Sequence, residues 1–187
     1  MGRFWAVCAG VAALLTMPWV YAATVPYVLD QRYCTIEFAT SGFIAAQGYF
    51  QHVTGHLDLD FQHPENSRIN VTVDDTALTV SPAFAAETLR SPAYFDSAKF
   101  PTVAFRSLSV AKLSETEFKI HGMLTMRGVT REQDMTAQLI STPAASNTAD
   151  FYVAGTLRRA DFGMVADQLT VSNLVRLRIH ARVEKAP

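Results

Sequence analysis

The chain has 187 residues, of which 49% are hydrophobic and 18% are charged, and its formal net charge is −1. This length suits one domain plus a targeting segment, and the composition is that of a folded globular protein rather than a disordered one. Because no excess of positive charge is present to hold a phosphate backbone, the composition argues against nucleic acid as a partner.

The first 22 residues are predicted to be a cleaved signal peptide. Arg3 gives a short positive start, residues 4–17 form an uncharged apolar run, Pro18 breaks that run, and Val20-Tyr21-Ala22 resembles a cleavage site. The apolar run is about 14 residues, whereas a membrane-spanning helix needs roughly 20. Cleavage is therefore favoured over an uncleaved anchor that reaches Ala23, and we expect an exported domain over residues 23–187.

The first clear strand pattern of that domain covers residues 35–40 and begins directly after Cys34. Cys8 lies in the predicted leader, so Cys34 would be the lone cysteine of the mature chain. A buried, inert thiol is the first interpretation of Cys34. The alternative is a reactive thiol or an intermolecular disulfide, which would make a homodimer.

Two further strands are predicted at residues 57–61 and 69–73, where apolar and polar residues alternate. Asp58 and Asp60 fall on the polar face of the first of these strands, where solvation is a simpler account than paired acid–base chemistry. Three histidines lie nearby, at His52, His56 and His63. No cysteine or further clustered ligand completes a metal site with them, so we interpret them as surface residues.

One short helix is predicted from Ser81, a good capping residue, to Leu89, with Pro82 at its first position and Pro92 stopping it. Strands follow at residues 103–110, 118–126, 135–140 and 151–157. The stretch 141–150 between the last two of these strands is predicted to be a flexible hairpin loop.

The pair Arg158-Arg159 ends the strand at 151–157 and is followed by Asp161. Alternation along a strand sends one arginine to each face of the sheet, so one of the two is expected to point inward or toward a rim. A buried guanidinium needs a compensating group. Either a salt bridge to Asp161 or another acid, or an anionic ligand head group, would supply it.

The clearest period of two lies at the C-terminus, where apolar residues at 175, 177, 179, 181 and 183 alternate with charged and polar ones. With about eight or nine amphipathic strands and one short helix, each strand must bury its apolar face against other strands. The predicted fold class is therefore all-β, a sandwich or a closed barrel. The sequence contains no nucleophile elbow, glycine-rich phosphate loop or dinucleotide fingerprint, so no catalytic residue is predicted.

Four separated stretches, taken together and in order, resemble the signature blocks of the YceI-like lipid- and polyisoprenoid-binding family. They are LRSPAYFDSAKFPTVAFRS (89–107), GMLTMRGVTRE (122–132), GTLRRADFGM (155–164) and TVSNLVRLRI (170–179). The resemblance extends from residue 28 to residue 184.

The resemblance implies an eight-stranded antiparallel, lipocalin-like barrel with one or two short helices, secreted to the bacterial periplasm. Family members are associated with isoprenoid chains, quinone-like tails or fatty amides, and with stress responses. The interior of an eight-stranded barrel is either filled by its own side chains or wide enough for one small ligand. Both alternatives stay open at this point.

Two positions depart from the family pattern. Where the family commonly has a His-Ser pair this chain has Tyr33-Cys34, and where a second histidine follows the next strand it has Gly42. If those polar residues help to fix a head group, this chain binds a different head group or holds its ligand mainly by the tail.

The predicted site consists of an apolar lining and a polar mouth, with core packing as the alternative for each apolar residue. The predicted lining comprises Ile36, Phe38, Phe105, Phe118, Ile120, Leu124, Phe151, Val153, Leu177 and Ile179, and the predicted mouth comprises Tyr33, Arg158, Arg159 and Asp161. No metal ligand is predicted, and no cofactor other than a bound isoprenoid or quinone lipid.

The predicted function is that of an exported carrier that sequesters a long apolar lipid, rather than that of an enzyme. Two alternatives remain. One is a periplasmic stress or interaction module without lipid cargo, and the other is an accessory protein that carries a quinone to a membrane redox enzyme.

Overall fold

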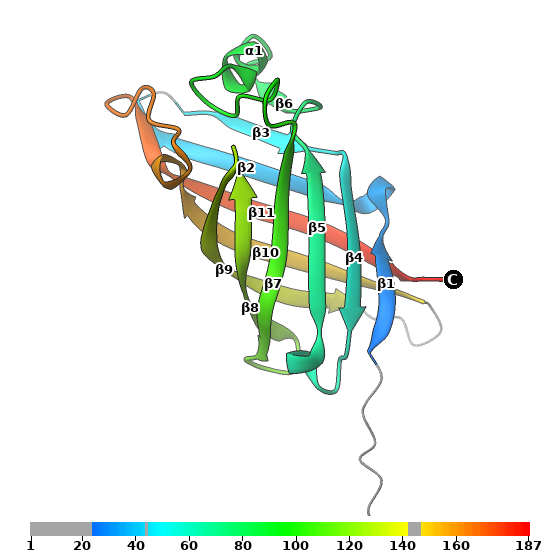
Figure 1. Ribbon diagram of the computed structural model, residues 1–187. Helices are drawn as coiled ribbons and strands as arrows, with labels where there is room; N and C mark the ends of the chain where they lie inside the picture. The colour runs from blue at the N-terminus through cyan, green and yellow to red at the C-terminus, as the bar shows by residue number, and fades with distance from the viewer. Residues whose placement is uncertain (1–23, 44, 142–146) are drawn as a thin grey trace, which may run out of the picture.

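The computed structural model describes residues 24–43, 45–141 and 147–187, which form an eight-stranded antiparallel barrel (Figure 1). Strand β1 pairs with both β4 and β11, and this pairing closes the ring β1-β4-β5-β7-β8-β9-β10-β11. The strands are β1 (Val25–Leu29), β2 (Thr35–Gly42), β3 (Gln47–Phe50), β4 (Val53–Leu59), β5 (Arg68–Asp74), β6 (Thr79–Ser81), β7 (Thr102–Lys112), β8 (Glu117–Met126), β9 (Val129–Ser141), β10 (Thr148–Arg158) and β11 (Val171–Lys185).

Three of the barrel strands are each interrupted once, which is why eleven segments make eight strands. Segments β1 and β2 form one barrel strand and pair with successive stretches of β11. Segments β4 and β3 form the next strand and pair with β1 and β2, respectively. Segments β5 and β6 form the third interrupted strand and pair with β4 and β3, respectively. The first interruption holds the short 3-10 helix η1 (Gln31–Tyr33). Interruptions of this kind let a sheet bend sharply. Two further 3-10 helices are η2 (Pro64–Asn66) and η3 (Arg159–Phe162).

The alternating patterns of the sequence correspond to the inner and outer faces of this barrel. In β8, Phe118, Ile120, Leu124 and Met126 are buried, whereas Glu117, before Phe118, and Lys119, between Phe118 and Ile120, are exposed. The same holds for β11, where Val175, Ala181 and Val183 are buried. Valine, isoleucine and phenylalanine fit the pleated, half-buried surface of a strand, so each strand buries one face in the barrel.

The helix begins later than the sequence predicts. Helix α1 covers Ala85–Arg90, because Ser81 ends β6, where it pairs with Gln47, and a turn then takes the chain to Ala85. Helix α1 and residues 91–101 lie over one end of the barrel (Figure 1). Among the described residues, no helix is long and apolar enough to cross a membrane.

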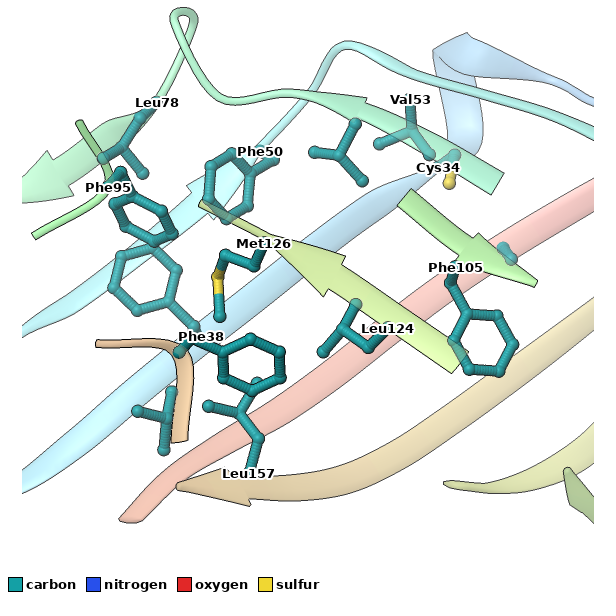
Figure 2. Packing of buried hydrophobic residues seen from close by; sticks show 14 of the residues in the cluster. Cys34, Phe38, Phe50, Val53, Leu78, Phe95, Phe105, Leu124, Met126 and Leu157 are labelled. Carbon is teal, nitrogen blue, oxygen red and sulfur yellow. The ribbon is translucent and has the colours of Figure 1, made fainter. Parts of the chain in front are cut away.

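Phe95, in the segment after α1, anchors this covering segment to the barrel. Its ring lies 5.7 Å from the ring of Phe50 and 6.3 Å from that of Phe38, both in edge-on arrangements. Figure 2 shows the three rings together with Met126. Edge-to-face aromatic packing of this kind contributes beyond simple area burial. At the same end, Arg127 links the segment after η3 to the segment after α1, because it donates hydrogen bonds to the carbonyl oxygens of Gly163 and Pro92.

Two expectations concern residues outside this description. The predicted leader falls within residues 1–23, and the centre of the predicted hairpin loop falls within residues 142–146, so both lie outside the described residues. The strands that flank this loop, β9 and β10, pair antiparallel as the hairpin prediction requires.

Asp75 lies in the interruption between β5 and β6 and is almost fully buried. Burial raises the pKa of its carboxyl group to about 6, and the nearby Asp74 adds to the rise, while Ser97 and Arg90 oppose it. The folded state therefore binds this proton more tightly than the unfolded chain does. The contribution of Asp75 to stability is most favourable in acid and declines as the pH rises from 3.8 through about 6.

We predict that Asp75→Asn gains stability relative to the wild type as the pH rises from about 4 to about 7, by on the order of 2 kcal/mol. Urea unfolding of both proteins across that range measures the difference. Asp134→Asn on β9 is the control, because hydrogen bonding to Lys119 and His121 lowers rather than raises the pKa of this carboxyl group. A pH-independent difference for Asp75→Asn would contradict the prediction.

Candidate functional site

The interior of the barrel contains a cavity of about 480 Å³. Its lining extends from Phe61 and Pro64, beside the β4–β5 connection, to Phe84 and Thr88 of the covering segment at the other end. The lining thus runs the length of the barrel. Since a water molecule occupies about 30 Å³ in the liquid, this space is far larger than a packing defect. It falls within the range of about 300–1,000 Å³ typical of small-molecule sites.

All ten residues predicted as apolar lining lie on the wall of this cavity. They come from five different strands: Ile36 and Phe38 from β2, Phe105 from β7, Phe118, Ile120 and Leu124 from β8, Phe151 and Val153 from β10, and Leu177 and Ile179 from β11. The structure brings them together because each stands on the inward phase of its strand. Their role toward a ligand stays a prediction.

A small cluster of packed side chains lies toward the end where β1 begins. Phe61 and Phe151 are stacked there with their ring centroids 6.3 Å apart, and Tyr27 meets Phe61 edge-on at 6.1 Å. Leu57, Leu59 and Val183 pack around them. Asp60 is not solvated on a strand face, as the sequence pattern suggested. It lies past the end of β4, is buried, and accepts hydrogen bonds from the backbone N–H groups of Gln62 and His63.

The four predicted mouth residues do not converge. Tyr33 lies in η1 beside Arg182 near the end of β11, whereas Arg159 contacts Val171 and Ser172 at the start of that strand. Tyr33 is therefore separated from the arginine pair along the length of β11. Its half-exposed ring lies under the guanidinium group of Arg182 at 4.3 Å.

The arginine pair divides between the two faces of the sheet, as alternation predicts. Arg158 is exposed and lies 3.9 Å from the carboxylate of Asp161. Arg159 is only 2% exposed and lines the cavity. Its guanidinium group donates to the carbonyl oxygens of Ser172, Met164 and Val171 at 2.8–3.1 Å. Three backbone acceptors, rather than an acid, thus hold the buried cation within the described chain.

Sequence reasoning missed two polar features of the wall. Tyr94 donates a hydrogen bond of 2.5 Å to Asp167, and burial together with this carboxylate raises the pKa of Tyr94 to about 12. Gln133 is buried on β9 and donates to the carbonyl oxygens of Asp134 and Thr156. Met135 and Ala137 face inward on β9, and Gln133, two residues earlier, falls on the same face, so the alternation could have identified it. Asp167, by contrast, lies in a loop whose sequence has no periodic pattern.

Most polar groups of the wall are therefore engaged with the protein itself. Asp60, Gln133 and Arg159 bond to backbone groups, and Asp167 bonds to Tyr94. Most of the remaining lining residues are aliphatic or aromatic, and the others are Cys34, Thr40, Ser67 and Thr88. Chemically, this space suits a long apolar molecule with few polar atoms. Among the described residues there is no group of three or more side chains that could hold a metal ion.

Cys34 is 2% exposed and also lines the cavity. Burial raises the pKa of its thiol to about 11. A thiol of this kind is a poor nucleophile at neutral pH, because the reactive species is the thiolate. The geometry favours the inert interpretation over an intermolecular disulfide, which would require an accessible sulfur atom.

We predict that iodoacetamide labels Cys34 in the folded protein at about pH 8 at least a hundredfold more slowly than in denaturant, because the raised pKa lowers the thiolate fraction and burial limits access. Intact mass spectrometry over time measures the rate, with Cys34→Ala as the blank. Rapid labelling, or a disulfide dimer on a non-reducing gel, would show that the thiol is accessible.

The comparisons with known proteins agree with this geometry. The YceI-like domain family matches residues 27–183. A UPF0312 protein of Enterobacter sp. (strain 638) is 32% identical over 129 residues, covering 67% of each chain. The protein YceI of Salmonella arizonae is 30% identical over 139 residues, covering 73% of this chain and 72% of its own.

Solved structures share the barrel at lower sequence identity. Burkholderia cenocepacia BcnA superposes with a TM-score of 0.75 at 16% identity, over 82% of this chain and 98% of its own. A polyisoprenoid binding domain from Saccharophagus degradans has a TM-score of 0.67 at 15% identity, over 87% of this chain and 99% of its own. The family match spans the whole barrel, and the chain belongs to the YceI-like family.

Proposed function

We propose that this protein is an exported carrier that binds and sequesters one long-chain apolar lipid, such as an isoprenoid, a quinone-like molecule or a fatty amide, inside its barrel. The observation that carries the proposal is the cavity of about 480 Å³, whose apolar lining runs the length of the barrel. The solved domain from Saccharophagus degradans, described as polyisoprenoid binding, supports the same class of cargo.

The free energy of burial is sufficient for such binding. An isoprenoid chain gains roughly 0.8 kcal/mol per buried methylene-sized group, so fifteen buried carbons contribute roughly 12 kcal/mol. Association costs on the order of 4 kcal/mol or more. The difference of about 8 kcal/mol corresponds to a Kd of about 1 μM. The length of the cavity would then select the ligand more than any single polar contact.

We infer that the protein binds its lipid without converting it, because the charged and amide side chains of the cavity wall already form hydrogen bonds within the protein. Arg159, Gln133 and the Tyr94–Asp167 pair each have partners within the protein. A general acid or base needs a free group within hydrogen-bond reach of the substrate. A carrier releases its cargo unchanged, so lipid recovered intact after long incubation would support this inference. A processed product would contradict it.

The periplasm is the proposed location. It rests on the pattern of residues 1–22, with a positive start, an apolar run and a cleavage site. N-terminal sequencing of protein recovered from the periplasmic fraction tests it, and a mature start near Ala23 is the expected result. A chain that keeps its apolar run and sediments with membranes would contradict it.

We predict that Ala137→Phe empties the barrel of lipid. Ala137 is buried on the cavity wall, where it pairs with Phe118 of the neighbouring strand β8. A phenyl ring at position 137 would therefore occupy cavity space. Organic extraction and mass spectrometry of the purified protein should give about one lipid per chain for the wild type and at least tenfold less for the variant. Quinone absorbance in the extract would identify a quinone carrier.

The matched control is Ala154→Phe, since Ala154 is exposed on the outer face of β10. This variant should keep the wild-type lipid content. If Ala137→Phe fails to fold, Ala181→Leu makes a smaller intrusion into the same cavity. A wild-type protein without stoichiometric lipid would instead favour an interaction module that works through its outer surface.

A further inference from the structure

A set of exposed apolar side chains lies at the end of the barrel covered by α1. They are Phe43 after β2, Phe84 before α1, and Val165 and Leu169 between η3 and β11, and we call them the apolar rim. Their exposed fractions are 94%, 83%, 58% and 101%. Solvent-exposed side chains of this size at loop tips are costly to keep in water, and a group of them marks an interaction surface.

The three loops that carry the apolar rim meet at one end of the molecule. Gly42 at the end of β2 pairs with Val171, so the turn with Phe43 adjoins the segment with Leu169. β3 pairs with β6, which leads directly to Phe84. The hydrogen bond between Tyr94 and Asp167 links the covering segment to the same loop. Figure 1 shows these segments together at the top of the barrel.

The apolar rim is continuous with the wall of the cavity. Phe84 is both strongly exposed and part of the lining, and Asp167, two residues from Leu169, also lines the cavity. An apolar molecule that leaves the barrel at this end thus meets Phe84, which belongs to both the wall and the rim. Toward the opposite end, the stacked rings of Phe61 and Phe151 line the cavity.

We propose that the apolar rim docks the barrel on the surface of a lipid bilayer, where cargo enters and leaves. This inference rests on the proposed function, because a carrier of a water-insoluble lipid must meet the membrane that supplies or receives it. Aromatic and leucine side chains at loop tips suit insertion at the boundary between head groups and acyl chains.

The charges around the apolar rim indicate which lipid surface it fits. Glu87 and Arg90 on α1 have opposite signs, and Arg158 is paired with Asp161 at 3.9 Å. Lys99 and Arg127 at this end are likewise accompanied by Asp96 and Asp167, so the described charges are mixed in sign and do not favour anionic lipids. Docking is therefore apolar in origin and requires neither negative lipid charge nor low salt.

The test is flotation of the purified protein with vesicles of pure phosphatidylcholine. We expect the wild type to bind, with less than a twofold change between about 0.05 and about 0.5 M salt. Phe43→Ser/Leu169→Ser should bind at least about tenfold more weakly, since two apolar side chains are lost from the contact. Neither residue lines the cavity, so this variant should keep its lipid content.

The matched control is Leu113→Ser/Ile140→Ser. These residues are exposed to 56% and 50%; Leu113 lies in the turn between β7 and β8, and Ile140 lies beside that turn near the end of β9. This variant should bind vesicles as the wild type does. Intact mass records whether the apolar run at residues 4–17 is present, because that run would bind vesicles by itself.

Equal vesicle binding by the rim variant and the wild type, or no binding by the wild type, would overturn the inference. A dimer that the rim substitutions convert to a monomer would also overturn it, because a second copy would then cover the rim. Lipid content is measured on the same samples. If the protein contains lipid but does not bind vesicles, only the docking inference is contradicted. If the protein contains no lipid but binds vesicles through the apolar rim, only the carrier function is contradicted.

Discussion

The pairing of β1 with β11 is the constraint on which the rest of the structure depends. It closes the sheet, so that every barrel strand has a neighbour on both sides and every inward face meets the same enclosed space. The side chains on that inner surface include small and medium-sized ones such as Ala137, Val153 and Leu177 as well as several phenylalanines. Together they leave a cavity of about 480 Å³ unfilled.

The polar residues of the interior limit what the cavity can hold. Arg159 introduces a full positive charge into an apolar wall, yet the backbone carbonyl oxygens of Met164, Val171 and Ser172 accept hydrogen bonds from three of its five N–H groups. Such charge-assisted hydrogen bonds stabilise the loop that they hold. The arginine thereby shapes the end of the barrel near the apolar rim. The same bonds leave it a weak candidate for binding a ligand head group.

The fold could be predicted from the sequence where alternation is regular, as in β8 and β11. Short segments such as β1, β3 and β6 have too few residues to show a period, and they were missed for that reason. The apolar lining followed from strand phase alone. The mouth did not, because Tyr33 and Arg159 lie in separate 3-10 regions whose positions depend on how the strands are interrupted. The contact between Tyr94 and Asp167 joins two loops, and no local pattern predicts it.

A crystal structure of the protein purified without lipid extraction tests the central claim most directly. The account predicts continuous, elongated electron density within the cavity, in contact with Phe118, Ile120 and Ile179. A barrel interior filled by its own side chains, or one that holds only ordered water, would contradict it.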